Sequence, residues 1–208
     1  MDPNDADIEW ILELQSLAPL DSKSWLELGY IGRVAISPEL MNLFWELGVS
    51  LKEAERGGQW VIPAGEWVSA YHGVTEQLYQ RTRLRSLELA VEGPKPEMLA
   101  TAPRLEKWIT VRERGDLASA LVGHVSGHPV LSNRWIRTSA LCGLAPDQRW
   151  ARTNSRWYVL GRAATPEHLA QILGAKAKGL QGAALPIHEA ISRTERAQAR
   201  EGFRNDPG

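Results

Sequence analysis

This 208-residue sequence has one cysteine, two phenylalanines and no long run of apolar residues. Because Cys142 stands alone, no disulfide can form within the chain, which is typical of a protein in a reducing compartment. No segment approaches the roughly 18 apolar residues of a membrane-spanning helix. Asp2, Asp5 and Asp7 lie where a secreted protein has a basic, apolar leader. The sequence therefore predicts a cytoplasmic protein without a membrane span.

The short motifs of the common enzyme classes are also missing. The sequence contains no Gly-x-Gly-x-x-Gly, no phosphate-binding P-loop, no His-Glu-x-x-His and no Gly-x-Ser-x-Gly. Carboxylate pairs such as Glu88 with Glu92 fall on predicted helix surfaces, where such charges are usually solvated. We therefore expect a protein that is not an enzyme and needs no cofactor.

One group of residues has the chemistry of metal ligands. His124, His128 and Cys142 would suit zinc or copper, but a closed zinc site needs four ligands and the chain has no second cysteine. His128 precedes Pro129 in a predicted turn, where it can bond to its neighbours instead. The apolar residues around Cys142 favour an inert core thiol with a raised pKa over a nucleophile. We expect neither a metal site nor a Cys–His catalytic pair.

Little net charge is present, but the charges that exist are segregated. The net charge is −1, whereas residues 1–103 hold 16 acidic against 8 basic residues and residues 104–162 hold 4 against 10. Such asymmetry suggests a surface that faces a polyanion, two segments that dock on each other, or simply a solvated dipolar surface.

Hydrophobic periodicity divides the chain into an acidic helical region (1–103), a basic β module (104–162) and C-terminal helices (163–208). Helices are expected from Asp7 to Leu17, from a Ser37 cap to Gly57-Gly58, over 66–91 and from Thr165, with a last, polar helix from Pro186 to Arg200 that lies on the surface or frays. Short strands are expected at 108–111, 120–125, 134–141, 149–153 and 156–160. The fold class is α+β, with a small antiparallel β-barrel or curled sheet.

Tryptophan and arginine alternate along the basic module. On a strand, Trp135 and Arg137 share one face, so a stacking ring and a cation can follow each other along it. Small β-barrels bind single-stranded nucleic acid in this way. The predicted contact set is Arg134, Trp135, Arg137, Arg149, Trp150, Arg152 and Arg156.

The same segment resembles a known domain family. The residues that carry the resemblance are Gly123-His124-Val125-Ser126-Gly127-His128-Pro129, Arg137-Thr138-Ser139, Trp150-Ala151-Arg152-Thr153 and 155–161. Over 123–161 they are similar to a small domain of unknown function found in short uncharacterised proteins of proteobacteria and their phages or mobile elements. The resemblance implies a compact β unit and transfers no activity.

Two alternatives to a nucleic-acid surface follow from the same residues. Trp135, Trp150 and Trp157 could fill the core of the β module while the arginines are solvated. The chain could also be a protein–protein adaptor, or an inhibitor from a phage or mobile element that acts on a host complex, because tryptophan and arginine dominate interface hot spots. Trp10 and Trp45 test this second alternative, since each lies beside the main apolar stripe of its helix.

Overall fold

The computed structural model describes residues 2–17, 33–49, 54–56, 59–113, 118–174 and 183–203. The chain divides into two compact units. The helical unit comprises Asp5–Arg81, and the β unit comprises Thr82–Gly208 together with residues 1–4. The boundary falls inside helix α4 (Ala64–Glu92), which differs from the division at residues 103 and 162 that the sequence suggests.

The helical unit combines helices with a small antiparallel sheet. In helix α3, the Ser37 hydroxyl caps the first turn by accepting the N–H of Leu40 at 3.2 Å. The helix ends at Glu46 and not, as predicted, at Gly57-Gly58, because Gly48 turns the chain with a φ of 71°. The elements are α1 (Asp5–Leu17), β1 (Arg33–Ile36), α3 (Pro38–Glu46), β2 (Ala54–Arg56), β3 (Gln59–Pro63) and the first part of α4, with the strands in the order β1-β3-β2.

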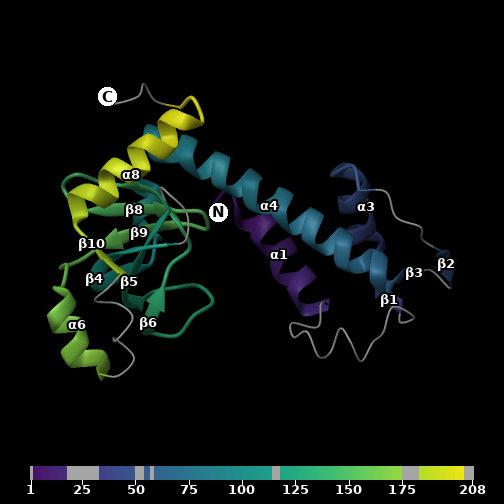
Figure 1. Cartoon of the computed structure of the whole chain (residues 1–208), viewed down its shortest axis with the longest axis horizontal. Helices are drawn as coiled ribbons and strands as arrows, with labels where there is room; N and C mark the ends of the chain where they lie inside the picture. The colour runs from purple at the N-terminus through teal and green to yellow at the C-terminus, as the bar shows by residue number, and fades with distance from the viewer. Residues whose placement is uncertain are drawn as a thin grey trace. The chain divides into compact units, whose positions relative to one another are not determined.

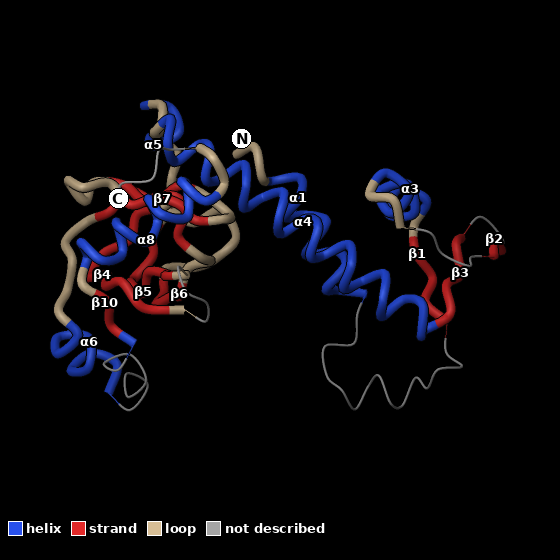
Figure 2. Tube along the Cα trace, turned by 45° about the horizontal axis from the view of Figure 1, so that its top comes forward, coloured by secondary structure: helices blue, strands red, loops and turns tan. Residues whose placement is uncertain are grey.

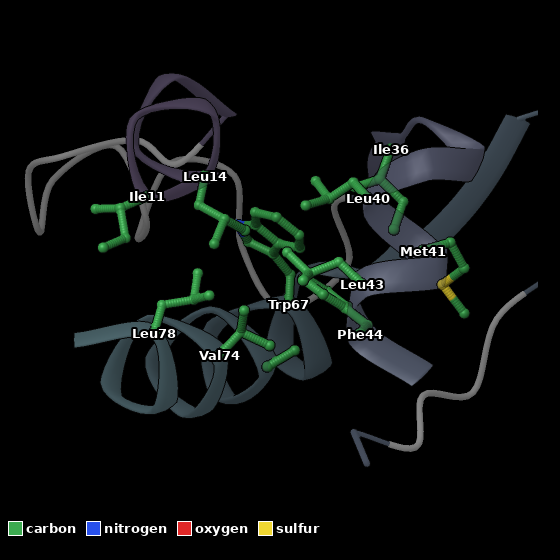
Figure 3. Close-up of a cluster of buried hydrophobic side chains, with 11 residues drawn as sticks. Ile11, Leu14, Ile36, Leu40, Met41, Leu43, Phe44, Trp67, Val74 and Leu78 are labelled. Carbon is green, nitrogen blue, oxygen red and sulfur yellow. The ribbon is translucent and has the colours of Figure 1, made fainter. Parts of the chain in front are cut away.

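A buried cluster centred on Trp67 holds the helical unit together. Figure 3 shows side chains from α1, α3 and α4 pointing toward one another around this indole. The ring of Trp67 stacks on Phe44 with 5.9 Å between centroids, and Leu14 and Leu78 are fully buried beside it. Trp67 is thus a core residue. Trp25 and the side chain of Trp60 lie outside the described residues.

The β unit is built around one open sheet (Figures 1 and 2). The strand order is β6-β5-β4-β9-β8-β7, and β10 pairs with β4. Neighbours are antiparallel except β4 and β9, which run parallel, so the sheet is mixed where an antiparallel one was predicted. Its strands are β4 (Arg104–Arg112), β5 (Ser119–Ser126), β6 (Arg134–Arg137), β7 (Leu141–Leu144), β8 (Trp150–Thr153), β9 (Trp157–Leu160) and β10 (Ala184–Leu185).

In the described residues, the helices of the β unit are α5 (Pro96–Ala100), α6 (Pro166–Leu173), α8 (Ile187–Arg200) and the C-terminal part of α4. Figures 1 and 2 both place α6 and α8 on opposite sides of the sheet. Together with the helical unit, this confirms the predicted α+β class, and the sheet is curled but not closed into a barrel. No helix within the described ranges is long and apolar enough to cross a membrane.

A β-bulge in β4 turns Trp108 into the core. The pairing of β4 with β5 shifts between Glu106 and Ile109, and Lys107 has a φ of 51°. Opposite the bulge, a Cβ on Gly123 would lie 2.9 Å from both the Leu105 and the Trp108 side chains. Glycine is therefore the residue that lets the two strands approach at this point.

The left-handed backbone at Lys107 carries a stability prediction. A side chain in this region costs about 1–2 kcal/mol, and the Lys107 side chain is exposed. We expect Lys107→Gly to raise the free energy of unfolding by about 0.5–1 kcal/mol, after the entropy that glycine adds to the unfolded chain is subtracted. Urea unfolding checks this, with Lys95→Gly as the control at an ordinary φ; a loss of stability in Lys107→Gly would contradict it.

Helix α8 does not fray on the surface as predicted. It packs on β7 and buries a stripe that contains Arg193, Thr194 and Gln198. Two side chains of this stripe are bonded: Gln198 Nε2 donates to the Cys142 carbonyl at 2.8 Å, and Arg193 Nη2 lies 3.1 Å from Glu189 Oε1. A helix whose buried residues are polar can still be part of the core when its neighbours supply the hydrogen bonds.

Candidate nucleic-acid interface

Strand β6 carries the first three residues of the predicted contact set, and it lies at the edge of the sheet. It pairs with β5 in a register that sets Arg134 opposite Val125, Trp135 opposite His124 and Arg137 opposite Val122. Arg134 and Arg137 are exposed, and Trp135 is half-buried. An aromatic ring therefore lies between two exposed cations on an edge strand.

The Trp135 side chain is partly packed in the core and partly exposed. Its ring meets the His124 ring edge to face, with 5.9 Å between centroids and an interplanar angle of 81°. Part of the indole also packs against a buried cluster that contains Ile109 and Leu169. This packing holds the ring in one orientation while the rest of it stays accessible.

The cations of the predicted contact set differ in how far their charge is neutralised. Arg137 Nε lies 2.7 Å from Glu113 Oε1, and Arg149 Nε lies 2.5 Å from Asp147 Oδ2. Among the residues that the structure describes, Arg134 and Arg156 have no carboxylate partner. These two guanidinium groups carry the unbalanced positive charge of the contact set.

His128 lies in the loop that joins β5 to β6. Its Nδ1 accepts the backbone N–H groups of Val130 at 3.2 Å and Leu131 at 3.1 Å. Partial burial, with the charges of Arg156 and Arg134, lowers the pKa of His128 from 6.5 to about 4. The imidazole is therefore neutral at physiological pH.

Arg152 occupies a different place from the rest of the set. Its side chain has no solvent exposure and forms an ion pair with Asp2, in which Nη2 lies 2.9 Å from Oδ1. Ser86 Oγ accepts from Nε at 3.2 Å and from Nη2 at 3.0 Å, and the guanidinium lies 5.3 Å from the centre of the Trp157 ring. The Arg152 guanidinium is thus buried and bonded to groups of the protein, so it is not available to a ligand in this structure.

The remaining tryptophans of the module separate into core and surface. Trp157 is buried, whereas Trp150 is half-buried and meets it edge to face at 5.2 Å. The expectation that these rings fill the core holds for Trp157 and in part for Trp150. Arg149 ends the turn between β7 and β8, and Trp150 begins β8. Among the described contacts, none joins either residue to Trp135 or Arg134.

The predicted metal and thiol candidates have structural partners. Within the described ranges, no group of three or more His, Cys, Asp or Glu side chains is placed to hold a metal ion. Burial raises the pKa of the Cys142 thiol to about 12, and its Sγ donates to Asn154 Oδ1 at 2.9 Å. Cys142 is an unreactive core residue at neutral pH, as its apolar neighbours predict.

A cavity of about 370 Å³ lies beside β4 and β10, at the start of α6 and α8. Its walls are mostly apolar, and none of the lining residues is titratable. The two threonines in its lining are already engaged, Thr110 with the Leu185 carbonyl and Thr165 with the N–H of His168. The described lining of the cavity therefore offers no titratable side chain and no unengaged threonine hydroxyl to a ligand.

The sequence was compared with models of known families and with known proteins. One model matches residues 74–199, that of the family of unknown function DUF6634. The chain belongs to this family. The match confirms the resemblance to an uncharacterised domain family and extends it well beyond residues 123–161. No curated protein and no solved structure matches the chain.

Two residues that shape the surface and its support are missed by reasoning from the sequence. The sequence predicts that His128 bonds to its neighbours in a turn, as it does, but it does not predict that the charges of Arg156 and Arg134 act on this ring. Asp2, the counter-charge of Arg152, lies outside the DUF6634 match, and nothing in its local sequence points to a residue 150 positions away. The Gly127-His128-Pro129 turn was the available signal for His128, since a ring in such a turn readily bonds to the backbone.

Proposed function

We propose that this DUF6634 protein binds single-stranded nucleic acid, alone or within a nucleoprotein complex, through β6 and the adjoining end of the sheet. The observation that carries the proposal is the half-exposed Trp135, held by His124 between the exposed Arg134 and Arg137. A base can stack on an accessible ring while cations beside it neutralise the backbone. A cytoplasmic, non-enzymatic binding protein is consistent with the inert Cys142.

The contact set of this proposal is narrower than the sequence suggests. It keeps Arg134, Trp135, Arg137 and Arg156, and it omits the buried Arg152. Arg149 and Trp150 become peripheral, because they lie at another turn and Arg149 is paired with Asp147. Arg137 contributes less than Arg134, since Glu113 already neutralises part of its charge.

Fluorescence anisotropy of labelled single-stranded DNA, duplex DNA and RNA, titrated at two salt concentrations, tests the proposal. We expect single strands to bind best and affinity to fall as salt rises. Trp135→Ala should weaken binding by about 5- to 150-fold, which corresponds to about 1–3 kcal/mol for one stacked base. Arg134→Ala should reduce the salt slope by about 0.7, the contribution of one phosphate contact on a single strand.

Arg149→Ala is the matched control, because it removes the same charge from an exposed arginine that lies outside the proposed set and is paired with Asp147. It should leave the affinity and the salt slope nearly unchanged. Thermal melting of Trp135→Ala and Trp135→Phe separates lost stacking from lost packing. Equal effects of Arg134→Ala and Arg149→Ala, or no salt-dependent binding by the unaltered protein, would exclude the proposal.

A protein partner is the second candidate function, and Trp45 favours it. The Trp45 side chain is 47% exposed at the C-terminal end of α3, whereas Trp10 is half-buried and packs on the core of the helical unit. Exposed tryptophans are frequent anchors of protein interfaces. If the protein is an adaptor or an inhibitor of a host complex, Trp45→Ala should abolish capture of that complex and leave thermal stability unchanged.

A further inference from the structure

The β unit holds the segment of residues 2–4 through directed polar contacts. The carboxylate of Asp2 forms a bidentate ion pair with the buried guanidinium of Arg152, in which Nη2 lies 2.9 Å from Oδ1. The Pro3 carbonyl accepts a hydrogen bond from Arg85 Nη1 at 2.6 Å, while Pro3 itself is exposed. The β unit therefore recognises the side chain of the first residue and the backbone of the second.

The third residue is recognised through its carboxamide. Asn4 is fully buried, and its Nδ2 lies within hydrogen-bond distance of three acceptors of the β unit. These acceptors are the Thr82 carbonyl at 3.2 Å, Ser86 Oγ at 2.7 Å and the Asn154 carbonyl at 2.7 Å. A carboxylate in the same place would set an acceptor oxygen against two carbonyl oxygens. This part of the contact is thus selective for asparagine over aspartate.

The segment is also pre-organised for this contact. Asp2 Oδ1 accepts the backbone N–H of Asn4 at 3.0 Å, which closes an Asx turn, and the ring of Pro3 fixes the φ angle between them. A ligand that is already held in its bound conformation loses less entropy when it binds. Three residues therefore suffice for a specific contact.

The two sides of the contact come from different parts of the sequence. The residues that bind the segment all lie within the DUF6634 region, and they are Thr82, Arg85, Ser86, Arg152 and Asn154. Residues 2–4 lie outside the matched region, 74–199. The Arg152 side chain has no solvent exposure, and a buried guanidinium without a counter-charge is costly. In this chain, the counter-charge is thus supplied from outside the family domain.

We propose that these residues of the DUF6634 region form a peptide-binding site that is selective for the sequence Asp-x-Asn, and that residues 2–4 are the ligand which the chain supplies to itself. The guanidinium accepts only the carboxylate and the carbonyls accept only the carboxamide, so the order of the two side chains is fixed. An Asp-x-Asn segment of another protein carries the same groups and competes with residues 2–4 for the site. The inference does not depend on nucleic-acid binding, since it uses no residue of the contact set proposed above.

The test uses a fluorescent peptide with the sequence of residues 2–8, Asp-Pro-Asn-Asp-Ala-Asp-Ile, acetylated at its N-terminus and labelled at its C-terminus. The peptide is titrated into the full chain carrying Asp2→Ala and Asn4→Ala, whose own segment no longer fills the site. We expect saturable binding to this double variant. Binding to the unaltered protein should be at least about tenfold weaker, because the tethered segment competes at an effective concentration of about millimolar.

The matched control is a peptide in which the two recognised side chains are exchanged, Asn-Pro-Asp-Asp-Ala-Asp-Ile. It has the same composition and charge, but it should bind at least about tenfold more weakly, since its carboxamide meets the guanidinium and its carboxylate meets the carbonyls. Formate, a carboxylate without the rest of the segment, should also bind more weakly than the peptide. Adding Arg152→Met to the double variant should abolish binding of the peptide.

Thermal melting provides a second readout, because the double variant lacks the counter-charge of Arg152 and is expected to be less stable than the unaltered protein. A ligand that binds only the folded state raises the Tm as its concentration rises, even for a marginally stable variant. The peptide should therefore raise the Tm of the double variant, and the exchanged peptide should not. If the double variant does not fold, Asp2→Asn, which keeps the shape of the side chain, replaces Asp2→Ala.

Three results would overturn the inference. Equal binding of the two peptides, or equal stabilisation by formate and by the peptide, would mean that Arg152 accepts any carboxylate and that Asn4 adds no selectivity. A folded double variant that binds no peptide at about 1 mM, the scale of a tethered ligand, would show that residues 2–4 are only a packed segment. A peptide that binds the unaltered protein as tightly as the double variant would bind at some other site.

Discussion

Replacing Asp2 by alanine is expected to lower the free energy of unfolding of the β unit by about 3–5 kcal/mol. The reason is Arg152, whose side chain has no solvent exposure and whose carboxylate partner among the described residues is Asp2. Removing one member of a buried ion pair leaves the other charge without compensation, and this costs more than the pair itself contributes. A substitution at the second residue of the chain would thus act like a core mutation.

The segment that carries Asp2 is bonded to the β unit at further points. Asn4 is buried, and its Nδ2 donates to Ser86 Oγ and to the Asn154 carbonyl, each at 2.7 Å. Arg85 Nη1 donates to the Pro3 carbonyl at 2.6 Å. The loss of Asp2 would weaken the attachment of this whole segment. Residues 82–86 and 154, which bind it, all lie within the DUF6634 region.

Amide hydrogen exchange of β8 and β9 measures this effect for the β unit separately from the helical unit. The double variant Asp2→Ala with Arg152→Met should be more stable than Asp2→Ala alone, because it removes the uncompensated charge as well as the pair. Asp147→Ala breaks the exposed pair with Arg149 and should have no measurable effect. An Asp2→Ala protein with unchanged exchange rates would show that Arg152 is stabilised without Asp2.

Local patterns in the sequence predict most of the elements. Ser37 begins a helix as expected, the run over 66–91 is helical within α4, and the strands of 104–162 appear near their predicted places. The exception is the expected strand at 134–141, which is broken into β6 and β7 by the residues around Thr138. Capping, period and turn residues act over a few positions, so a single sequence contains them in full.

What the sequence does not reveal depends on contacts between distant residues. On β8, strand alternation predicts that Arg152 is solvated beside Trp150, but residues 151–153 are all buried because both faces of this strand are covered. The buried polar face of α8 also depends on a distant partner, because Gln198 donates to the carbonyl of Cys142, 56 positions away. The parallel pairing of β4 with β9 joins strands that are separated by most of the module. No local pattern encodes these partners.

One part of the proposed surface can be predicted from local sequence, and another part depends on contacts that form in the fold. The order Arg134, Trp135, Arg137 along one strand is visible in the sequence, and the structure keeps it on the edge strand β6. The shape of the loop before β6 is not visible, because it depends on the backbone N–H groups of Val130 and Leu131 bonding to the His128 ring. The sequence thus indicates the order of residues along β6, whereas the conformation of the loop beside this strand comes from the fold.

Replacing Trp108 by alanine should lower the free energy of unfolding of the β unit by about 3–5 kcal/mol. The indole is fully buried within the cluster that contains Leu105, Leu121 and Val125. Its Nε1 also donates to the Gly161 carbonyl at 3.0 Å, and this bond ties the bulged strand β4 to the residue that follows β9. Alanine would remove both the packing and the hydrogen bond.

The surroundings of Trp108 place the expected loss toward the upper end of this range. The indole already lines the apolar cavity of about 370 Å³, so the space left by the ring would join an existing void. The cost of a large-to-small substitution rises with the residual cavity, and apolar walls give an entering water few partners.

Trp108→Phe should lose less stability than Trp108→Ala, since it retains most of the ring volume and lacks only the bond to Gly161. Urea unfolding followed by hydrogen exchange measures each loss, with the exposed Trp45→Ala as the control for the same chemical change. A Trp108→Ala variant as stable as Trp45→Ala would mean that the bulge does not direct this ring into the core.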